Sequence, residues 1–181
     1  MTGHHTLAET ERAVANRIGG MPIDLHAMVA VSNIYRAANA IRNHLEHSVL
    51  KSADLTWTGF VVLWVIWIWD GMETRHVAQE AGISKGTLTG VVKTLIARGL
   101  VVRTIHPDDG RLVLLSLSPK GARLMNQLFP AFNAEEGFVV TGLDDAAVGD
   151  LADRLRHIVA HLEASSVDRQ AALRATESNP R

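Results

Sequence analysis

The chain of 181 residues contains no cysteine. Disulfide bonds, thiol redox switches and thiolate metal sites are therefore excluded. Aromatic residues are also few, at 5% of the chain, with a single tyrosine. The first residues, Met1 to His5, lack the basic and apolar regions of a secretory signal peptide, so a cytoplasmic location is expected.

A strong charge of either sign is also missing, because the formal net charge is only −1. The charge is nevertheless unevenly distributed. Residues 71–125 carry eight Lys or Arg against four Asp or Glu, whereas residues 126–181 carry five against nine. An excess of positive charge in the middle of the chain would attract phosphates, so this segment is the candidate for nucleic-acid binding.

Long hydrophobic runs are absent too. The longest is the ten-residue run Phe60–Trp69, and a membrane helix needs about 20 such residues, so no membrane partner is expected. All four tryptophans lie between Trp57 and Trp69. The pattern predicts a helix buried on every side, with Thr56 as its cap and Asp70-Gly71 as its end.

The stretch from Thr74 to Leu117 has the order of a winged helix-turn-helix. A short helix is predicted to start at Thr74, whose hydroxyl would cap it, and to end at Gly82. Ser84 would cap a second helix that reaches Arg98 and stops at Gly99. Two aliphatic strands, 101–106 and 111–117, would then form a hairpin around the turn 107–110.

These residues resemble the core signature of the MarR family of bacterial transcription regulators. The resemblance rests on three motifs: Ile83-Ser84-Lys85-Gly86-Thr87-Leu88-Thr89, Leu95-x-x-x-Gly99-Leu100-Val101-x-Arg103, and Asp109-x-Arg111 followed by Leu117-Ser118-x-x-Gly121. It implies a mainly α fold with a small β-hairpin wing, and a homodimer that binds a double-stranded, pseudo-palindromic operator, as a repressor by family analogy. Family members that sense peroxide through a reactive cysteine are not a match, because this chain has none.

Amphipathic helices are predicted on both sides of this lobe. One extends from about Leu25 to Leu50, another follows Ser118-Pro119, and a third spans Asp144–Glu163 with an apolar residue every three or four positions. We therefore expect residues 56–117 to form the DNA-binding lobe, and residues 25–55 and 118–165 to form a helical dimerisation region. Residues 1–24 would be an N-terminal extension with a short helix at Leu7–Ile18, and residues 166–181 a C-terminal tail.

The predicted DNA contacts follow from position and chemistry. The start of the second helix enters the major groove in helix-turn-helix proteins, which selects polar residues there, and the resemblance adds residues of the strands and wing. Arg111 would enter the minor groove, with Asp109 holding its guanidinium in place. The predicted set is Ser84, Lys85, Thr87, Thr89, Lys93, Thr94, Arg103, Asp109 and Arg111. Gly86 and Gly90 leave one face of this helix bare, which either permits close approach to the groove or removes base contacts.

The resemblance also implies a small aromatic or phenolic effector. The tryptophan helix and its neighbours supply apolar walls and a few polar groups, namely Tyr35, Arg42, His44, Trp64 and Trp67. The alternative for the tryptophans is a purely structural core role.

Other functions remain as alternatives. The pairs His44/His47 and His157/His161 have spacings that bring two imidazoles to one helix face, which would suit a metal-sensing regulator, but neither has an evident third ligand. A winged helix that binds proteins is a second alternative, although the retained positive charge favours DNA. No cofactor, metal site, catalytic residue or enzymatic activity is predicted, because the run Gly82–Thr87 lacks the first glycine of a phosphate loop and no catalytic set stands out.

Overall fold

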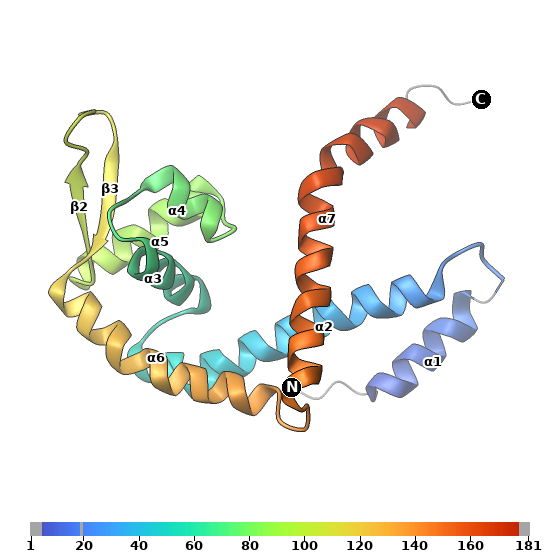
Figure 1. Ribbon diagram of the computed structural model, residues 1–181. Helices are drawn as coiled ribbons and strands as arrows, with labels where there is room; N and C mark the ends of the chain where they lie inside the picture. Colours follow the sequence, from blue (N-terminus) through green and yellow to red (C-terminus); the bar gives the residue numbers. More distant parts are fainter. Residues whose placement is uncertain (1–4, 19, 178–181) are drawn as a thin grey trace. The chain divides into compact units, whose positions relative to one another are not determined.

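The computed structural model describes residues 5–18 and 20–177. The described chain is mainly helical, and Figure 1 shows its elements in sequence order. They are α1 (Leu7–Ile18), α2 (Leu25–Ser48), the 3₁₀ helix η1 (Leu50–Ala53), α3 (Trp57–Trp69), β1 (Met72–Glu73), α4 (Thr74–Glu80), α5 (Lys85–Ala97), β2 (Val101–Ile105), β3 (Val113–Leu117), α6 (Pro119–Val139) and α7 (Asp145–Glu177). By its contacts the chain divides into two units, one up to Glu135 and one from Glu136 onward.

The local signals at the turn and at both ends of α5 are confirmed. Ser84 Oγ accepts a hydrogen bond from the Thr87 backbone N–H at 3.1 Å and so caps α5. Gly82 and Gly99 both have positive φ angles, +62° and +69°, which glycine adopts without steric cost. Helix α5, the recognition helix of the motif, therefore begins and ends where its sequence predicts.

The cap predicted at Thr74 is wrong. Glu73 occupies the N-cap position of α4, without a side-chain hydrogen bond, and Thr74 is the first helical residue. The Thr74 hydroxyl instead donates to the Val113 carbonyl at 3.2 Å. The reason is β1, a strand that the sequence pattern did not indicate, which pairs antiparallel with β3 and brings this residue beside it.

The wing is a three-stranded antiparallel sheet in the order β1-β3-β2. Its central pairing places Arg103 opposite Leu115 and Val101 opposite Leu117. The connecting loop is longer than the predicted four-residue turn, because the strands end at Ile105 and resume at Val113. The backbone N–H of His106 donates to the Leu112 carbonyl at 3.0 Å and closes this loop.

Helix α3 is the centre of the core, packed against α2, α4, α5 and β3. Thr56 Oγ1 accepts from the Gly59 N–H, so the predicted cap is confirmed. The prediction that α3 is buried on every side is wrong, since Trp64, Ile68 and Trp69 are 39%, 51% and 59% exposed. The helix is covered on the face that its neighbours touch, and its sequence, which is apolar throughout the run Phe60–Trp69, does not reveal which face that is.

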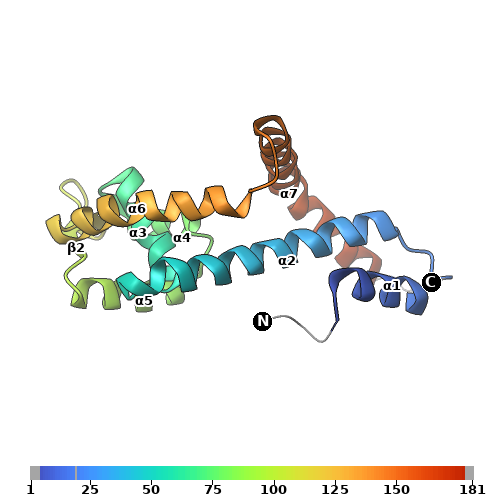
Figure 2. The same cartoon turned by 90° about the horizontal axis from the view of Figure 1, so that it is seen from below.

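Figure 2 shows helices α2 and α6 from below, and Glu135 of α6 contacts His44 of α2. α6 begins as predicted, with Ser118 Oγ accepting from the Gly121 N–H at 3.0 Å. Its buried residues Met125, Leu128 and Phe132 form the expected stripe, and the Phe132 ring stacks on Phe60 with centroids 4.1 Å apart. α6 thereby connects the wing to the core around α3.

The N-terminal helix matches its predicted bounds, Leu7–Ile18, while residues 1–4 and 19 of the predicted extension lie outside the described residues. The long helix α2 ends at Ser48 and is followed by η1, slightly earlier than predicted. The predicted third helix ends later than Glu163, because α7 continues to Glu177 and so includes most of the predicted C-terminal tail. The apolar repeat fades after Leu162, but Ala-rich sequence keeps a high helix propensity.

Candidate nucleic-acid interface

The candidate interface comprises the exposed start of α5 and the wing. Lys85, Thr87 and Thr89 are all exposed, as is the capping residue Ser84. The Thr87 hydroxyl is 2.8 Å from Ser84 Oγ, and the Thr89 hydroxyl donates to the Lys85 carbonyl at 2.9 Å. These side chains therefore stay close to the helix backbone, at the end whose free N–H groups and dipole attract phosphate.

Three of the predicted residues come together behind this helix. Thr89, Lys93 and Arg103 line a cavity of about 380 Å³ between α5 and the sheet. Thr74 lines the same cavity. Thr74 was not among the predicted residues, because no local signal indicates that β1 carries it to the wing. Thr94 lies elsewhere on α5, where its hydroxyl donates to the Gly90 carbonyl at 3.2 Å.

At the tip of the wing, Asp109 and Arg111 interact differently from the prediction. The Asp109 carboxylate accepts from the backbone N–H of Arg111 at 2.9 Å, rather than from its guanidinium. The carboxylate of an aspartate readily accepts a hydrogen bond from the backbone N–H two residues later in the chain. The long side chain of Arg111 extends into solvent instead. Both residues are exposed, so the loop is held by Asp109 while the Arg111 side chain is left to face solvent.

The bare face of α5 is confirmed as open space. A Cβ added at Gly90 would meet nothing within 4 Å, and one at Gly86 would meet only Ser84 Oγ, at 3.8 Å. Neither glycine is therefore required by packing within this chain. Because glycine has no side chain, these two positions affect only how closely another molecule can approach the helix.

We expect Gly90→Ala to raise the free energy of unfolding by about 0.5–1 kcal/mol, because alanine loses less conformational freedom in a helix. If the bare face approaches DNA closely, the same change should weaken operator binding. Thermal melting and DNA titration of the one variant measure both effects. Unchanged or tighter DNA binding would contradict close approach at this position.

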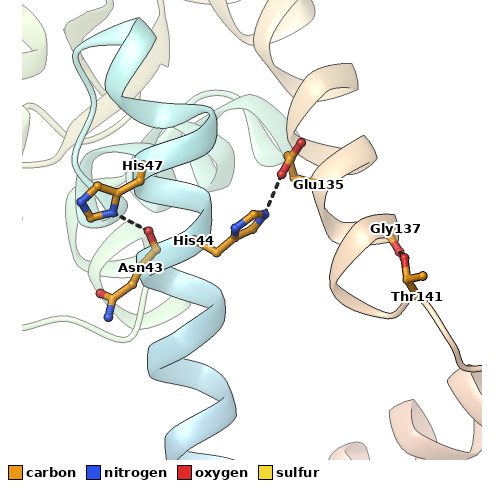
Figure 3. Close-up of polar contacts among 6 residues, drawn as sticks. All are labelled: Asn43, His44, His47, Glu135, Gly137 and Thr141. Carbon is orange, nitrogen blue, oxygen red and sulfur yellow. Dashed lines mark hydrogen bonds and ion pairs between the residues drawn. The ribbon is translucent and has the colours of Figure 1, made fainter. Parts of the chain in front are cut away.

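The predicted effector residues are dispersed over α2 and α3. Tyr35, Arg42 and Trp64 are exposed, whereas Trp67 is half-buried with its ring 5.3 Å from that of Phe129. His44 Nε2 lies 2.6 Å from Glu135 Oε2, which joins α2 to α6 (Figure 3).

The histidine pair of α2 does not converge. His47 Nδ1 lies 2.7 Å from the Asn43 carbonyl, on the opposite side of α2 from the His44 contact (Figure 3). Within residues 5–18 and 20–177, no group of three or more His, Asp or Glu side chains is placed to hold a metal ion. No helix in this described part has the length and apolar content to span a bilayer.

An exposed, capped helix followed by a β-wing that carries two exposed arginines, Arg103 and Arg111, is the arrangement of a winged helix-turn-helix DNA-binding protein. Comparison with known proteins agrees. Residues 55–113 match the model of the MarR family. The uncharacterized HTH-type transcriptional regulator YwaE of Bacillus subtilis (strain 168) is 31% identical over 162 residues, covering 88% of this chain and 95% of that protein.

This chain therefore belongs to the MarR family of transcriptional regulators. Two solved structures are also similar. BpsR of Bordetella bronchiseptica, whose DNA binding is regulated by 6-hydroxynicotinic acid, is 25% identical with a TM-score of 0.66, covering 72% of this chain and 98% of that one. CouR of Rhodococcus jostii RHA1, bound to p-coumaroyl-CoA, is 28% identical with a TM-score of 0.63, covering 69% and 87%.

Proposed function

We propose that this protein is a homodimeric repressor that binds a pseudo-palindromic operator and responds to a small ligand. The observation that carries the proposal is the exposed, capped start of α5 beside a wing with the exposed arginines Arg103 and Arg111, in a chain of the MarR family. Ser84, Lys85, Thr87 and Thr89 would meet the major groove and its phosphates, and Arg111 the minor groove. The DNA target implies a cytoplasmic location in bacteria.

The exposed apolar residues of α7 support the homodimer. Leu151, Leu155, Ile158 and Leu162 follow a spacing of three and four residues, yet each is between 38% and 54% exposed in the single chain. Polar pairs flank them, and in one of these Arg154 donates to Asp150 at 2.7 Å, a hydrogen bond that raises the pKa of Arg154 above its usual value. A second copy of this helix would cover the apolar stripe.

A small aromatic or phenolic effector is proposed by analogy with BpsR and CouR. The side chains that we assign to it are Tyr35, Arg42, His44, Trp64 and Trp67. The exposed indole of Trp64 offers a flat apolar surface on α3, the helix that packs against the recognition helix α5. A ligand bound here would change DNA affinity if it binds the DNA-bound and the DNA-free conformations of the protein with different free energies. The change in DNA affinity equals that difference in free energy.

Dimeric operator binding predicts a dimer by sedimentation and a footprint with half-sites about one DNA turn apart, roughly 34 Å. Leu155→Glu should dissociate the dimer and abolish tight operator binding, because it places a charge within the apolar stripe. Leu143→Glu, at an exposed leucine outside α7, is the matched control. A monomer that still binds one half-site tightly would contradict the proposal.

For the effector, indole fluorescence is a direct probe because all four tryptophans lie on α3. We would titrate 6-hydroxynicotinic acid and salicylate with and without operator DNA. A fluorescence response coupled to weaker DNA binding supports the proposal. Binding that leaves operator affinity unchanged would show a pocket without regulation, and no response would favour a structural role for the tryptophans.

A further inference from the structure

Two adjoining cavities lie along α6. None of the predicted effector residues lines them, although His44 contacts Glu135 at the larger one. The larger, of about 490 Å³, lies between α6 and the segment formed by the end of α2 and η1. The smaller, of about 280 Å³, lies at the start of α6, beside the end of α5. Both are lined by Leu124 and Gln127, so together they form one trough along the helix.

The smaller end of the trough is cationic. Arg98, Lys120 and Arg123 all line it, and none of its described lining residues is acidic. The Arg98 guanidinium donates to the carbonyls of Ala53, at 2.8 Å, and Asp54, while Lys120 Nζ donates to the Arg98 carbonyl at 2.9 Å. An arginine has five donors and a lysine three, so these bonds leave donors for a further acceptor.

Charge near this end stays positive overall. The one carboxylate recorded beside it within the described residues is that of Asp54, whose Oδ2 lies 3.9 Å from the Arg98 guanidinium and is almost fully exposed. Two arginines and a lysine around a small cavity suit a phosphate group, since guanidinium binds phosphate through paired hydrogen bonds and ammonium acts as a point charge.

The larger end has the opposite chemistry. Glu135 is the only charged residue among its described lining, and Ser48, Ser52 and Gln127 supply hydroxyl and amide groups. The Ser52 hydroxyl donates to the Val49 carbonyl at 2.7 Å, which leaves its oxygen as an acceptor. Because Glu135 Oε2 lies 2.6 Å from His44 Nε2, the acceptors left at this end are Glu135 Oε1 and the serine and amide oxygens. They favour an uncharged ligand portion with N–H or O–H donors.

We infer that this trough binds a phosphorylated small molecule of nucleotide type. Its phosphate would lie against Arg98, Lys120 and Arg123, and its uncharged body, with hydrogen-bond donors, against Gln127 and Glu135. A single ligand with both parts matches the two ends, whereas a simple anion or an uncharged ring matches only one.

The trough also includes a residue that holds the end of the recognition helix α5 in place. Arg98 is the C-cap residue of α5, and its guanidinium joins that helix to the carbonyls of Ala53 and Asp54 before α3. A phosphate bound to the remaining donors of Arg98 would change how this guanidinium holds the two segments together. Binding itself does not depend on the proposed function, whereas an effect on operator affinity does.

The test compares adenosine monophosphate with its two parts, adenosine and inorganic phosphate, by calorimetry and thermal melting of the full chain without DNA. We expect the nucleotide to bind at least 10-fold more tightly than either part. Arg123→Glu should remove that advantage, because Arg123 is exposed and its replacement reverses the local charge without disturbing the core. Arg12→Glu, at an exposed arginine on α1, is the matched control and should bind normally.

A second variant tests the uncharged end. Ala131→Leu fills the larger cavity from an exposed helical position, so it should weaken binding of the nucleotide but not of inorganic phosphate. If phosphate binds as well as the nucleotide, the cationic end is an adventitious anion site and the inference is wrong. It is equally overturned if Arg123→Glu binds like the original chain. Because these measurements contain no DNA, failure here leaves the proposed function untouched.

Discussion

Arg111→Ala is expected to weaken operator binding by about 1–3 kcal/mol, roughly 5- to 150-fold, while the melting temperature stays nearly constant. The Arg111 side chain is exposed at the tip of the wing, and an exposed charge contributes little to folding. The hydrogen bond that holds the loop, from the Arg111 backbone N–H to Asp109, survives the substitution. Titration of an operator duplex at several salt concentrations measures the effect. The salt slope, which is the slope of log affinity against log salt concentration, should fall in magnitude by about 1 if a phosphate contact is lost.

Asp109→Ala is the informative comparison for this variant. It removes the acceptor of that backbone bond, so it should loosen the wing tip and weaken DNA binding through the shape of the loop. Its salt slope should therefore change less than that of Arg111→Ala. An equal loss of melting temperature and DNA affinity in Arg111→Ala would instead assign the arginine a structural role.

Gly121→Ala should destabilise the fold by about 3 kcal/mol or more. A Cβ at this position would lie 2.1 Å from the carbonyl oxygen of Leu100, which is backbone and cannot move aside as a side chain would. The surroundings are held tightly, because Ser118 donates its hydroxyl to the Gly99 carbonyl at 2.6 Å and its N–H to the Leu100 carbonyl at 2.9 Å. Chemical denaturation with a circular dichroism readout measures the loss.

Gly137→Ala provides the control on the same helix. A Cβ there would meet nothing within 4 Å, so the substitution should be neutral or stabilise by up to about 1 kcal/mol. If both variants unfold at the same denaturant concentration, the close approach of α6 to Leu100 is not a constraint in solution.

The local sequence determined most of the DNA-binding lobe. Ser84, Thr56 and Ser118 cap the helices that follow them, as predicted, because each cap needs only a hydroxyl three residues before the N–H from which it accepts. Gly82 and Gly99 end their helices for an equally local reason, since both have positive φ. The start and end of the recognition helix therefore depend on neighbouring residues alone.

The tertiary structure decided the features that depend on distant residues. The two-residue strand β1 exists because Met72 and Glu73 pair with Leu115 and Leu114, more than 40 positions away. That pairing places Thr74 beside β3, where its hydroxyl donates to Val113 instead of capping α4. The exposed side of α3 was likewise set by its neighbours, since a helix with Thr58 as its one polar residue does not indicate by its sequence which face they cover.

The assignments around Arg111 and Arg98 show the same division. The Asp109–Arg111 motif was visible in sequence, but only the folded loop decided that the carboxylate binds a backbone N–H instead of the guanidinium. Arg98 was visible only as the last residue of a helix, and its bonds to Ala53 and Asp54 join segments about 45 residues apart. Short-range hydrogen bonds depend on neighbouring residues, whereas the pairing of remote segments depends on how the whole core packs.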